Sequence, residues 1–168
     1  MVIVMKTRNT MLAVARALVL VFLAGLSPLA AAWLVPECGF AVDLPGGAEP
    51  QKLTMPANDI TILYTVQDGK WTYAMSCARQ AKPPADAVAA LEAAQGKLKG
   101  KVKSSRKLTV NGKPGRDVEL VTATGAISRY RLIYVGATLY TITVTVPAGD
   151  AMSGKTAVFI ESFKLTAG

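Results

Sequence analysis

The amino-acid sequence predicts an α+β domain in which an antiparallel sheet of six or seven strands is covered by two helices. Residues 60–66 and 71–77 alternate between apolar and other side chains on either side of an Asp-Gly turn. Residues 102–146 contain four more alternating segments separated by short turns, and helical patterns occupy residues 83–100 and 151–163. Consecutive strands joined by short turns pair antiparallel, so the region of four strands is expected to be a meander.

The first 32 residues have the three parts of a secretory signal peptide. A positively charged segment without acidic residues comes first, residues 17–26 form an apolar run, and residues 30–32 are alanines of the kind that precede a cleavage site. We therefore predict cleavage before Trp33 and one exported domain over residues 33–168.

Such a domain would lie in the periplasm or be secreted. The alternative is a protein anchored in the inner membrane through residues 17–35, a stretch that carries no charge and is close to the length that spans a bilayer. Ser27 and Pro28 interrupt that stretch, which favours the cleaved signal peptide.

The first part of the domain reads as a strand followed by a hairpin. Residues 39–44 alternate and are closed by a Pro-Gly-Gly turn. In the hairpin, an Asp68-Gly69 turn would place Val66 opposite Trp71 and Tyr64 opposite Tyr73, with all apolar side chains on one face.

A helix is expected to begin at Pro83 and Pro84 and to end at Gly96 or Gly100, because proline is tolerated in the first turn of a helix. Its apolar stripe consists of Val88, Leu91, Gln95 and Leu98.

The meander follows, with strands at residues 102–110, 116–122, 126–135 and 139–146. Turns of three residues would place Tyr134 with Tyr140 and Leu132 with Ile142 on the interior face. Asp117 would then lie beside Arg131, and Glu119 beside Arg129, as ion pairs on the solvated face. The last helix, residues 151–163, is expected to bury Val158, Phe159 and Phe163.

Cys38 and Cys77 are the two cysteines of the sequence. An oxidising compartment favours a disulfide between them, and closing a loop of about 40 residues would stabilise the fold by roughly 4 kcal/mol. The alternative is two independent buried thiols. Their spacing differs from that of a redox-active pair.

The composition excludes several classes of enzyme. Histidine is absent, which removes Ser-His-Asp triads, Cys-His pairs and zinc sites that contain histidine. We predict no catalytic residue, no cofactor and no metal site.

Residues 149–156 match the pattern of a phosphate-binding loop, G-x-x-x-x-G-K-S/T. That loop functions after a parallel strand, whereas the strand before it here closes an antiparallel meander. We interpret residues 149–156 as a turn before a helix capped by Asp150 or Ser153, and predict that the protein binds no nucleotide. The sequence leaves open the alternative that a simple anion binds at the N-terminus of that helix.

Residues 97–107 form a basic stretch with no acidic residue, on a chain whose formal net charge is +8. This stretch is the candidate anion-binding site, and the alternative is that it is a solvated helix end and strand start. Nucleic acid is disfavoured because no aromatic residues lie between the basic ones. The candidate residues are Lys97, Lys99, Lys101, Lys103, Arg106 and Lys107.

Four segments together resemble the PsbP-like group (PsbP/Mog-type α/β/α sandwich) of bacterial envelope and lumenal proteins. They are G-F-A-V-D-L-P at residues 39–45, N-G-x-P-G-R at 111–116, R-Y-R-L-I-Y at 129–134 and F-I-E-S-F-K-L at 159–165. The resemblance implies an antiparallel sheet between helices and an accessory or binding role without enzymatic activity. It transfers no functional residue, and the cysteines are outside its pattern.

The leading hypothesis is therefore an exported, non-enzymatic accessory protein that binds another envelope component. The alternative is an anion-binding module that uses residues 97–107 or the N-terminus of the last helix to hold acidic lipid or glycan. Nothing in the sequence specifies the oligomeric state.

Overall fold

A computed structural model describes residues 32–47, 49–55 and 60–166. The chain divides between residues 31 and 32, and every described residue belongs to the second part. Apart from Ala32, the predicted signal peptide lies outside the described residues. Of the alternative anchor, residues 17–35, the structure describes only the end, which forms a β-strand rather than a helix. Within the described ranges, no helix has the length and apolar character needed to cross a bilayer.

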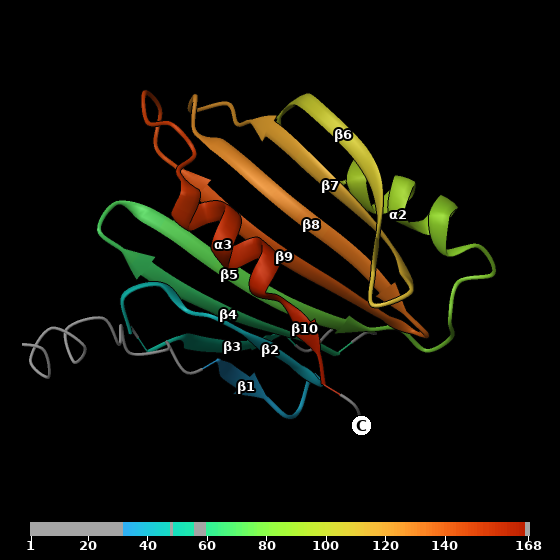
Figure 1. Ribbon diagram of the computed structural model, residues 1–168. Coiled ribbons are helices and arrows are strands. Elements are labelled where there is room, and N and C mark those ends of the chain that lie inside the picture. Colours follow the sequence, from blue (N-terminus) through green and yellow to red (C-terminus); the bar gives the residue numbers. More distant parts are fainter. Residues whose placement is uncertain (1–31, 48, 56–59, 167–168) are drawn as a thin grey trace, which may run out of the picture. The chain divides into compact units, whose positions relative to one another are not determined.

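The fold is α+β, as predicted, with a seven-stranded sheet in the order β3-β4-β5-β9-β8-β7-β6 and a separate three-stranded sheet in the order β1-β2-β10 (Figure 1). Every pair of neighbouring strands is antiparallel. In chain order, the elements are β1 (Trp33–Val35), β2 (Phe40–Val42), η1 (Pro45–Gly47), β3 (Gln51–Met55), β4 (Ile60–Asp68), β5 (Trp71–Arg79), α2 (Ala87–Gly96), β6 (Lys101–Val110), β7 (Lys113–Val121), β8 (Ile127–Val135), β9 (Thr138–Val146), α3 (Gly154–Ser162) and β10 (Lys164–Leu165).

The small sheet is a feature that the sequence pattern did not predict. The expected strand at residues 39–44 is present only as β2, which lies between β1 and β10 rather than in the main sheet. The last helix ends at Ser162 instead of continuing to Phe163, and β10 then pairs with β2. Strands of two or three residues are too short to show an alternating pattern.

The β4–β5 hairpin forms with a different turn from the predicted one. Asp68 pairs with Trp71, so Gly69 and Lys70 are the central residues, and Val66 lies opposite Tyr73. Gly69 has a φ of 60° whereas Asp68 is still extended, and glycine at the first central position is the type II′ arrangement. The change moves each pairing by two residues, which keeps the apolar side chains on the predicted face.

The predicted meander is confirmed, but its last turn changes which side chains face the core. A two-residue turn, Gly136-Ala137, joins β8 to β9, and Ile133 lies opposite Tyr140 instead of Tyr134. The difference of one residue reverses the faces of β8 relative to the prediction. Arg131 consequently shares a face with Ile142, whereas Leu132 and Tyr134 point to the opposite side.

Both faces of the sheet are therefore partly covered (Figure 1). On one face, α3 and the small sheet pack over the central strands and bury Tyr73, Ile142 and Phe159. On the other face, Leu91 of α2 packs against Leu132 and Tyr134.

Helix boundaries follow from their caps. The first helix begins at Ala87, later than the expected Pro83, because the carboxylate of Asp86 accepts hydrogen bonds from the backbone amides of Val88 and Ala89. Two predicted core residues are exposed: Val88 on α2 and Val158 on α3, the latter at 61%. Phe159 and Phe163 are buried as predicted.

Candidate functional site: a charged cluster on the α3 face of the sheet

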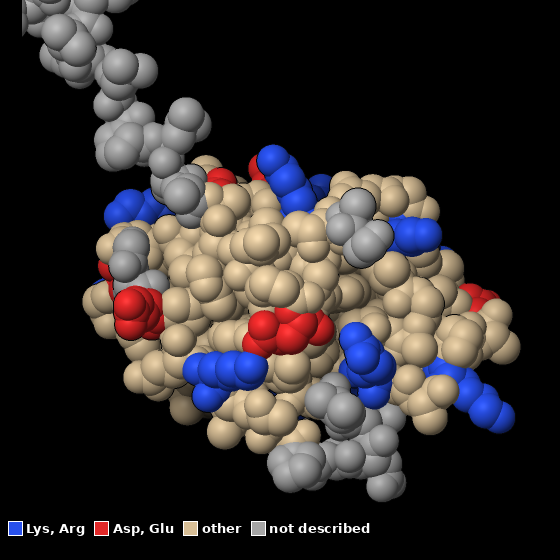
Figure 2. All heavy atoms as spheres, turned by 90° about the horizontal axis from the view of Figure 1, so that it is seen from below, with Lys and Arg blue, Asp and Glu red and all other residues tan. Residues whose placement is uncertain are grey.

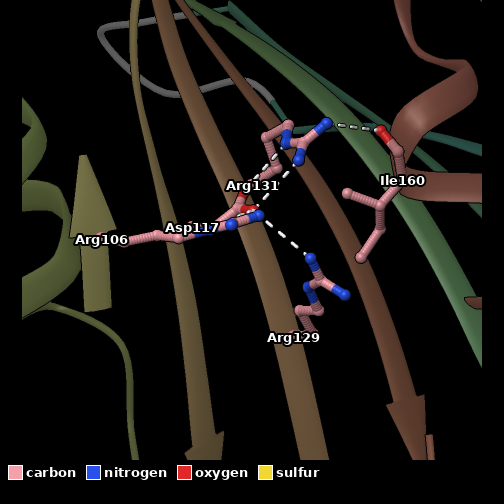
Figure 3. A network of polar contacts seen from close by, with 5 residues as sticks. All are labelled: Arg106, Asp117, Arg129, Arg131 and Ile160. Carbon is pink, nitrogen blue, oxygen red and sulfur yellow. Dashed lines mark hydrogen bonds and ion pairs between the residues drawn. The ribbon is translucent and has the colours of Figure 1, made fainter. Parts of the chain in front are cut away.

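On the α3 face, a cluster of charged side chains is centred on Asp117. This residue lies opposite Arg131, as predicted for the pairing of β7 with β8. The Asp117 carboxylate accepts hydrogen bonds from Nε and Nη2 of Arg131, at 2.8 and 3.0 Å. Arg131 also donates from Nη1 to the backbone carbonyl oxygen of Ile160 on α3, at 3.1 Å (Figure 3). The prediction that this pair is solvated was wrong: Asp117 is 5% and Arg131 8% exposed, because α3 covers this face.

Two further arginines reach the same carboxylate from the less covered side. Arg106 on the edge strand β6 donates from Nη2 at 2.8 Å, and Arg129 on β8 donates from Nη2 at 3.4 Å (Figure 3). Burial by itself raises the pKa of Asp117, but the hydrogen bonds from Arg131 and Arg106 and the charge of Arg129 outweigh it and hold that pKa below its ordinary value. Asp117 is therefore ionised at neutral pH in this cluster.

Beside this carboxylate lies a hollow of about 260 Å³, which we call the arginine hollow. The side chains of Arg106 and Arg129 are 66% and 22% exposed there. Together with Lys103 and Arg131, four positive side chains form ion pairs with two carboxylates, Asp117 and Glu119, and the charge of a third, Glu161 on α3, also acts on Arg106. The positive charges still outnumber the negative ones. The hollow is lined mainly by Ser104, Arg106, Asp117, Glu119 and Arg129.

An arrangement of this kind can bind a carboxylate or phosphate group through the remaining guanidinium donors of Arg106 and Arg129. Across residues 32–47, 49–55 and 60–166, no cluster of three or more His, Cys, Asp or Glu side chains is placed to hold a metal ion.

The structure divides the basic stretch 97–107 into two groups. Lys103, Arg106 and Lys107 form ion pairs with Glu119, Asp117 and Glu92, at 3.5, 2.8 and 3.6 Å. The other three are exposed, and in the described part of the chain no carboxylate oxygen lies within 4.0 Å of their amines: Lys97, Lys99 and Lys101.

The segment that matches a phosphate-binding loop follows β9, a strand antiparallel to both of its neighbours. The hydroxyl of Thr156 donates to the backbone carbonyl oxygen of Ser153, at 2.6 Å, and is buried within the first turn of α3. Asp150, an expected cap, instead accepts hydrogen bonds from Lys70 and Trp71, at 2.7 and 3.0 Å. Ser153 is the N-cap residue, but its side chain makes no capping hydrogen bond.

The predicted disulfide between Cys38 and Cys77 is present, with Cα atoms 5.9 Å apart. It joins the turn after β1 to β5 and therefore ties the small sheet to the main sheet. Next to it, the Tyr140 hydroxyl donates to the backbone carbonyl oxygen of Cys38, at 2.7 Å.

Arg116 is a buried charged residue that the sequence analysis did not single out. It points to the α2 face and donates to Glu92, Ser105 and Gln95, at 2.6, 3.0 and 3.2 Å. A signal was available in the sequence, since adjacent charges at the centre of a strand must point to opposite faces, and both faces of a sheet between helices are covered.

No family model matches the sequence, and no curated protein matches it either. A solved structure from Bacteroides thetaiotaomicron VPI-5482 is 14% identical, with a TM-score of 0.52 over 81% of this chain and 48% of that chain. This chain thus spans about half the length of the Bacteroides protein. The solution structure of cyanobacterial PsbP (CyanoP) from Synechocystis sp. PCC 6803 is 11% identical, with a TM-score of 0.55 over 84% of this chain and 96% of that chain. The antiparallel sheet, the two helices and the structural similarity to this second structure together show that the chain has the PsbP-like fold.

Proposed function

We propose that this chain is an exported, non-enzymatic accessory protein that binds an acidic segment of another envelope protein along β6. The observation that carries the proposal is the position and charge of this strand. It is the outer strand of the seven-stranded sheet, residues 101–107 are all exposed, and four of those residues are positively charged.

An edge strand has backbone groups that can pair with an added strand. Lysines on such an edge oppose pairing with a second copy of the same strand, because like charges would meet. The same lysines favour an added strand that carries glutamate or aspartate. A β-bulge between Val102 and Ser104 interrupts the pairing of β6 with β7, so the longer regular part of the strand is residues 104–110.

The arginine hollow would extend this interaction. Arg106 and Ser104 line the hollow, and an acidic side chain of the added strand on this face would lie beside the exposed guanidinium of Arg106. At the other side of the molecule, charges are scattered over a mostly uncharged surface (Figure 2). Charge complementarity therefore favours β6 over the opposite edge, β3, for an acidic partner.

The second candidate is an anion-binding module for acidic lipid or glycan. The specific observation in its favour is that Lys97, Lys99 and Lys101 are exposed without a carboxylate partner among the described residues. The N-terminus of α3 is less suited to an anion, because the carboxylate of Asp150 lies just before it in the sequence.

Cross-linking in intact cells tests the main proposal. A photo-reactive residue placed at Ser104 or Thr109 on β6 is expected to capture one protein partner, and the same residue at Thr54 on β3 is not. Arg106→Glu should abolish the cross-link, whereas Lys82→Glu, a matched change before α2, should leave it intact. Capture from Thr54 alone, or cross-links that are insensitive to Arg106→Glu, would reject β6 as the interface.

Liposomes separate the second candidate from the first. Salt-sensitive retention on vesicles with anionic lipid, lost when Lys97, Lys99 and Lys101 are replaced by alanine, would favour the anion-binding module. Export rests on the signal-peptide pattern and agrees with the disulfide. Sequencing the N-terminus of the mature protein should give Trp33, and a retained leader would favour the membrane anchor.

A further inference from the structure

A second hollow, of about 410 Å³, lies on the α2 face of the sheet, and we call it the α2 groove. One wall consists of Ala90, Ala93 and Ala94 on α2, and the floor includes Leu132 on β8 and Leu139 on β9. The small alanine side chains leave room between the helix and the sheet. The middle of the groove is therefore apolar.

One end of the groove presents a buried hydroxyl. Tyr134 is 5% exposed, and its Oη accepts a hydrogen bond from Nε2 of Gln80, at 2.7 Å. No described residue accepts the hydroxyl proton of Tyr134. Because a phenolic oxygen both donates and accepts, this group can still donate to a ligand oxygen.

Lys97, which caps α2 at its C-terminus, also lines the groove and is exposed. Its amine has no carboxylate within 4.0 Å in the described part of the chain. Because the positively charged Lys97 lies next to the apolar middle of the α2 groove, the groove suits an apolar ligand that ends in a carboxylate.

The hydroxyl and the amine lie at opposite ends of the groove. Glu92 of α2 reaches Lys107, which is level with Leu132, whereas Gln95 reaches Ser105, two residues earlier on β6. The helix therefore runs away from Tyr134, and Lys97 lies beyond the far side of Leu132. A rise of 1.5 Å per residue places Ala90 and Lys97 about 10 Å apart along the axis.

We infer that the α2 groove binds an elongated apolar molecule with a carboxylate at one end, beside Lys97, and an oxygen acceptor at the other, beside Tyr134. A medium-chain hydroxy acid such as 8-hydroxyoctanoate has this chemistry. The site is independent of the main proposal, since the arginine hollow lies on the opposite face of the sheet. It shares Lys97 with the second candidate, the anion-binding module.

The test is an NMR-monitored titration of the purified protein with 8-hydroxyoctanoate, octanoate and 1,8-octanediol. We expect 8-hydroxyoctanoate to bind most tightly and to shift the resonances of Ala90, Leu132 and Leu139. Octanoate lacks the hydroxyl and 1,8-octanediol lacks the carboxylate, so each should bind about fivefold more weakly than 8-hydroxyoctanoate. Equal affinities for the three probes, or shifts that map to β6, would overturn the inference.

Variants assign the two ends. Tyr134→Phe should remove the preference for 8-hydroxyoctanoate over octanoate, and Lys97→Gln should remove its preference over the diol. Lys99→Gln is the matched control, two residues further along and outside the groove, and should change neither. Ala93→Trp, at an exposed position on the wall, should abolish binding while thermal unfolding shows a folded protein. If Lys97→Gln and Lys99→Gln changed the affinity for 8-hydroxyoctanoate equally, the carboxylate would be attracted by the general positive charge of this region, and the proposed site would be rejected.

Discussion

The carboxylate of Asp117 on β7 is held by both Nε and Nη2 of Arg131 on β8, in a part of the sheet that α3 covers. Because Arg131 also donates to the Ile160 carbonyl oxygen, one guanidinium joins two neighbouring strands, β7 and β8, to the last helix. This part of the cluster has a structural role, whereas Arg106 and Arg129 are the more exposed members that the proposed interaction would use.

Removing the charge of Asp117 should therefore destabilise the fold strongly. Asp117→Asn leaves Arg131 buried without its counter-ion, and we expect a loss of about 3 to 5 kcal/mol in the free energy of unfolding, measured with urea. Asp117→Leu combined with Arg131→Met should recover most of that loss. Glu119→Gln, in a more exposed ion pair, should cost less than about 1 kcal/mol. Equal effects of Asp117→Asn and Glu119→Gln would contradict this assignment.

The same pair should make stability depend on pH. The folded-state pKa of Asp117 lies below its ordinary value of 3.8. Its stabilisation is thus fully present above that value and is lost as the pH falls through the folded-state pKa. Urea midpoints measured between pH 6 and pH 3 should decrease below about pH 4, and less steeply in the Asp117→Leu/Arg131→Met variant. Parallel curves for the two proteins would show that Asp117 is not responsible.

Loss of the disulfide should weaken the attachment of the small sheet. Cys38 and Cys77 are 39 residues apart in sequence, and a cross-link that closes such a loop stabilises by about 4 kcal/mol on the chain-entropy model. Cys38→Ala combined with Cys77→Ala should lower the free energy of unfolding by about that amount, with dithiothreitol producing a similar loss in the wild-type protein. An unchanged urea midpoint in the double variant would argue against this role.

Two glycines at the C-terminal end of α2 and just beyond it offer a matched comparison. A Cβ at Gly100, where φ is 146°, would lie 2.6 Å from Cδ1 of Leu120 and from the backbone oxygen of Val121. A Cβ at Gly96 would meet nothing within 4 Å. Gly100→Ala should lower the free energy of unfolding by more than about 1 kcal/mol, whereas Gly96→Ala should be neutral or stabilise by up to about 1 kcal/mol. The reverse order in thermal unfolding would mean that this close approach is absent.

Alternating patterns were sufficient to predict the antiparallel meander, and the pairing of Asp117 with Arg131 was also correct. They could not show which face of β8 is the interior. The aromatic and leucine side chains of β8 occupy one face, and the prediction therefore took that face as the one turned to the main core. In the structure, α2 covers Leu132 on that face, and α3 covers Arg131 on the other. Periodicity separates two faces but does not identify the element that packs on each.

The candidate site was only partly predictable for the same reason. Residues 97–107 were identified from charge alone, but charge does not reveal that Arg106 reaches Asp117 while Lys101 has no such carboxylate partner among the described residues. That distinction depends on β6 lying at the edge of the sheet, beside β7. The pairing of β6 with β7 was part of the predicted meander, but the position of β6 at the edge of the whole sheet was not encoded in a local pattern.

The most direct test of the proposed function is an NMR titration with a peptide in which glutamate and valine alternate. If β6 accepts an acidic strand, the largest amide shifts should occur in residues 101–110, amide exchange there should slow, and the affinity should fall as salt is added. A peptide of alternating lysine and valine should produce none of these changes. Shifts centred on β3, or equal responses to the two peptides, would contradict the account.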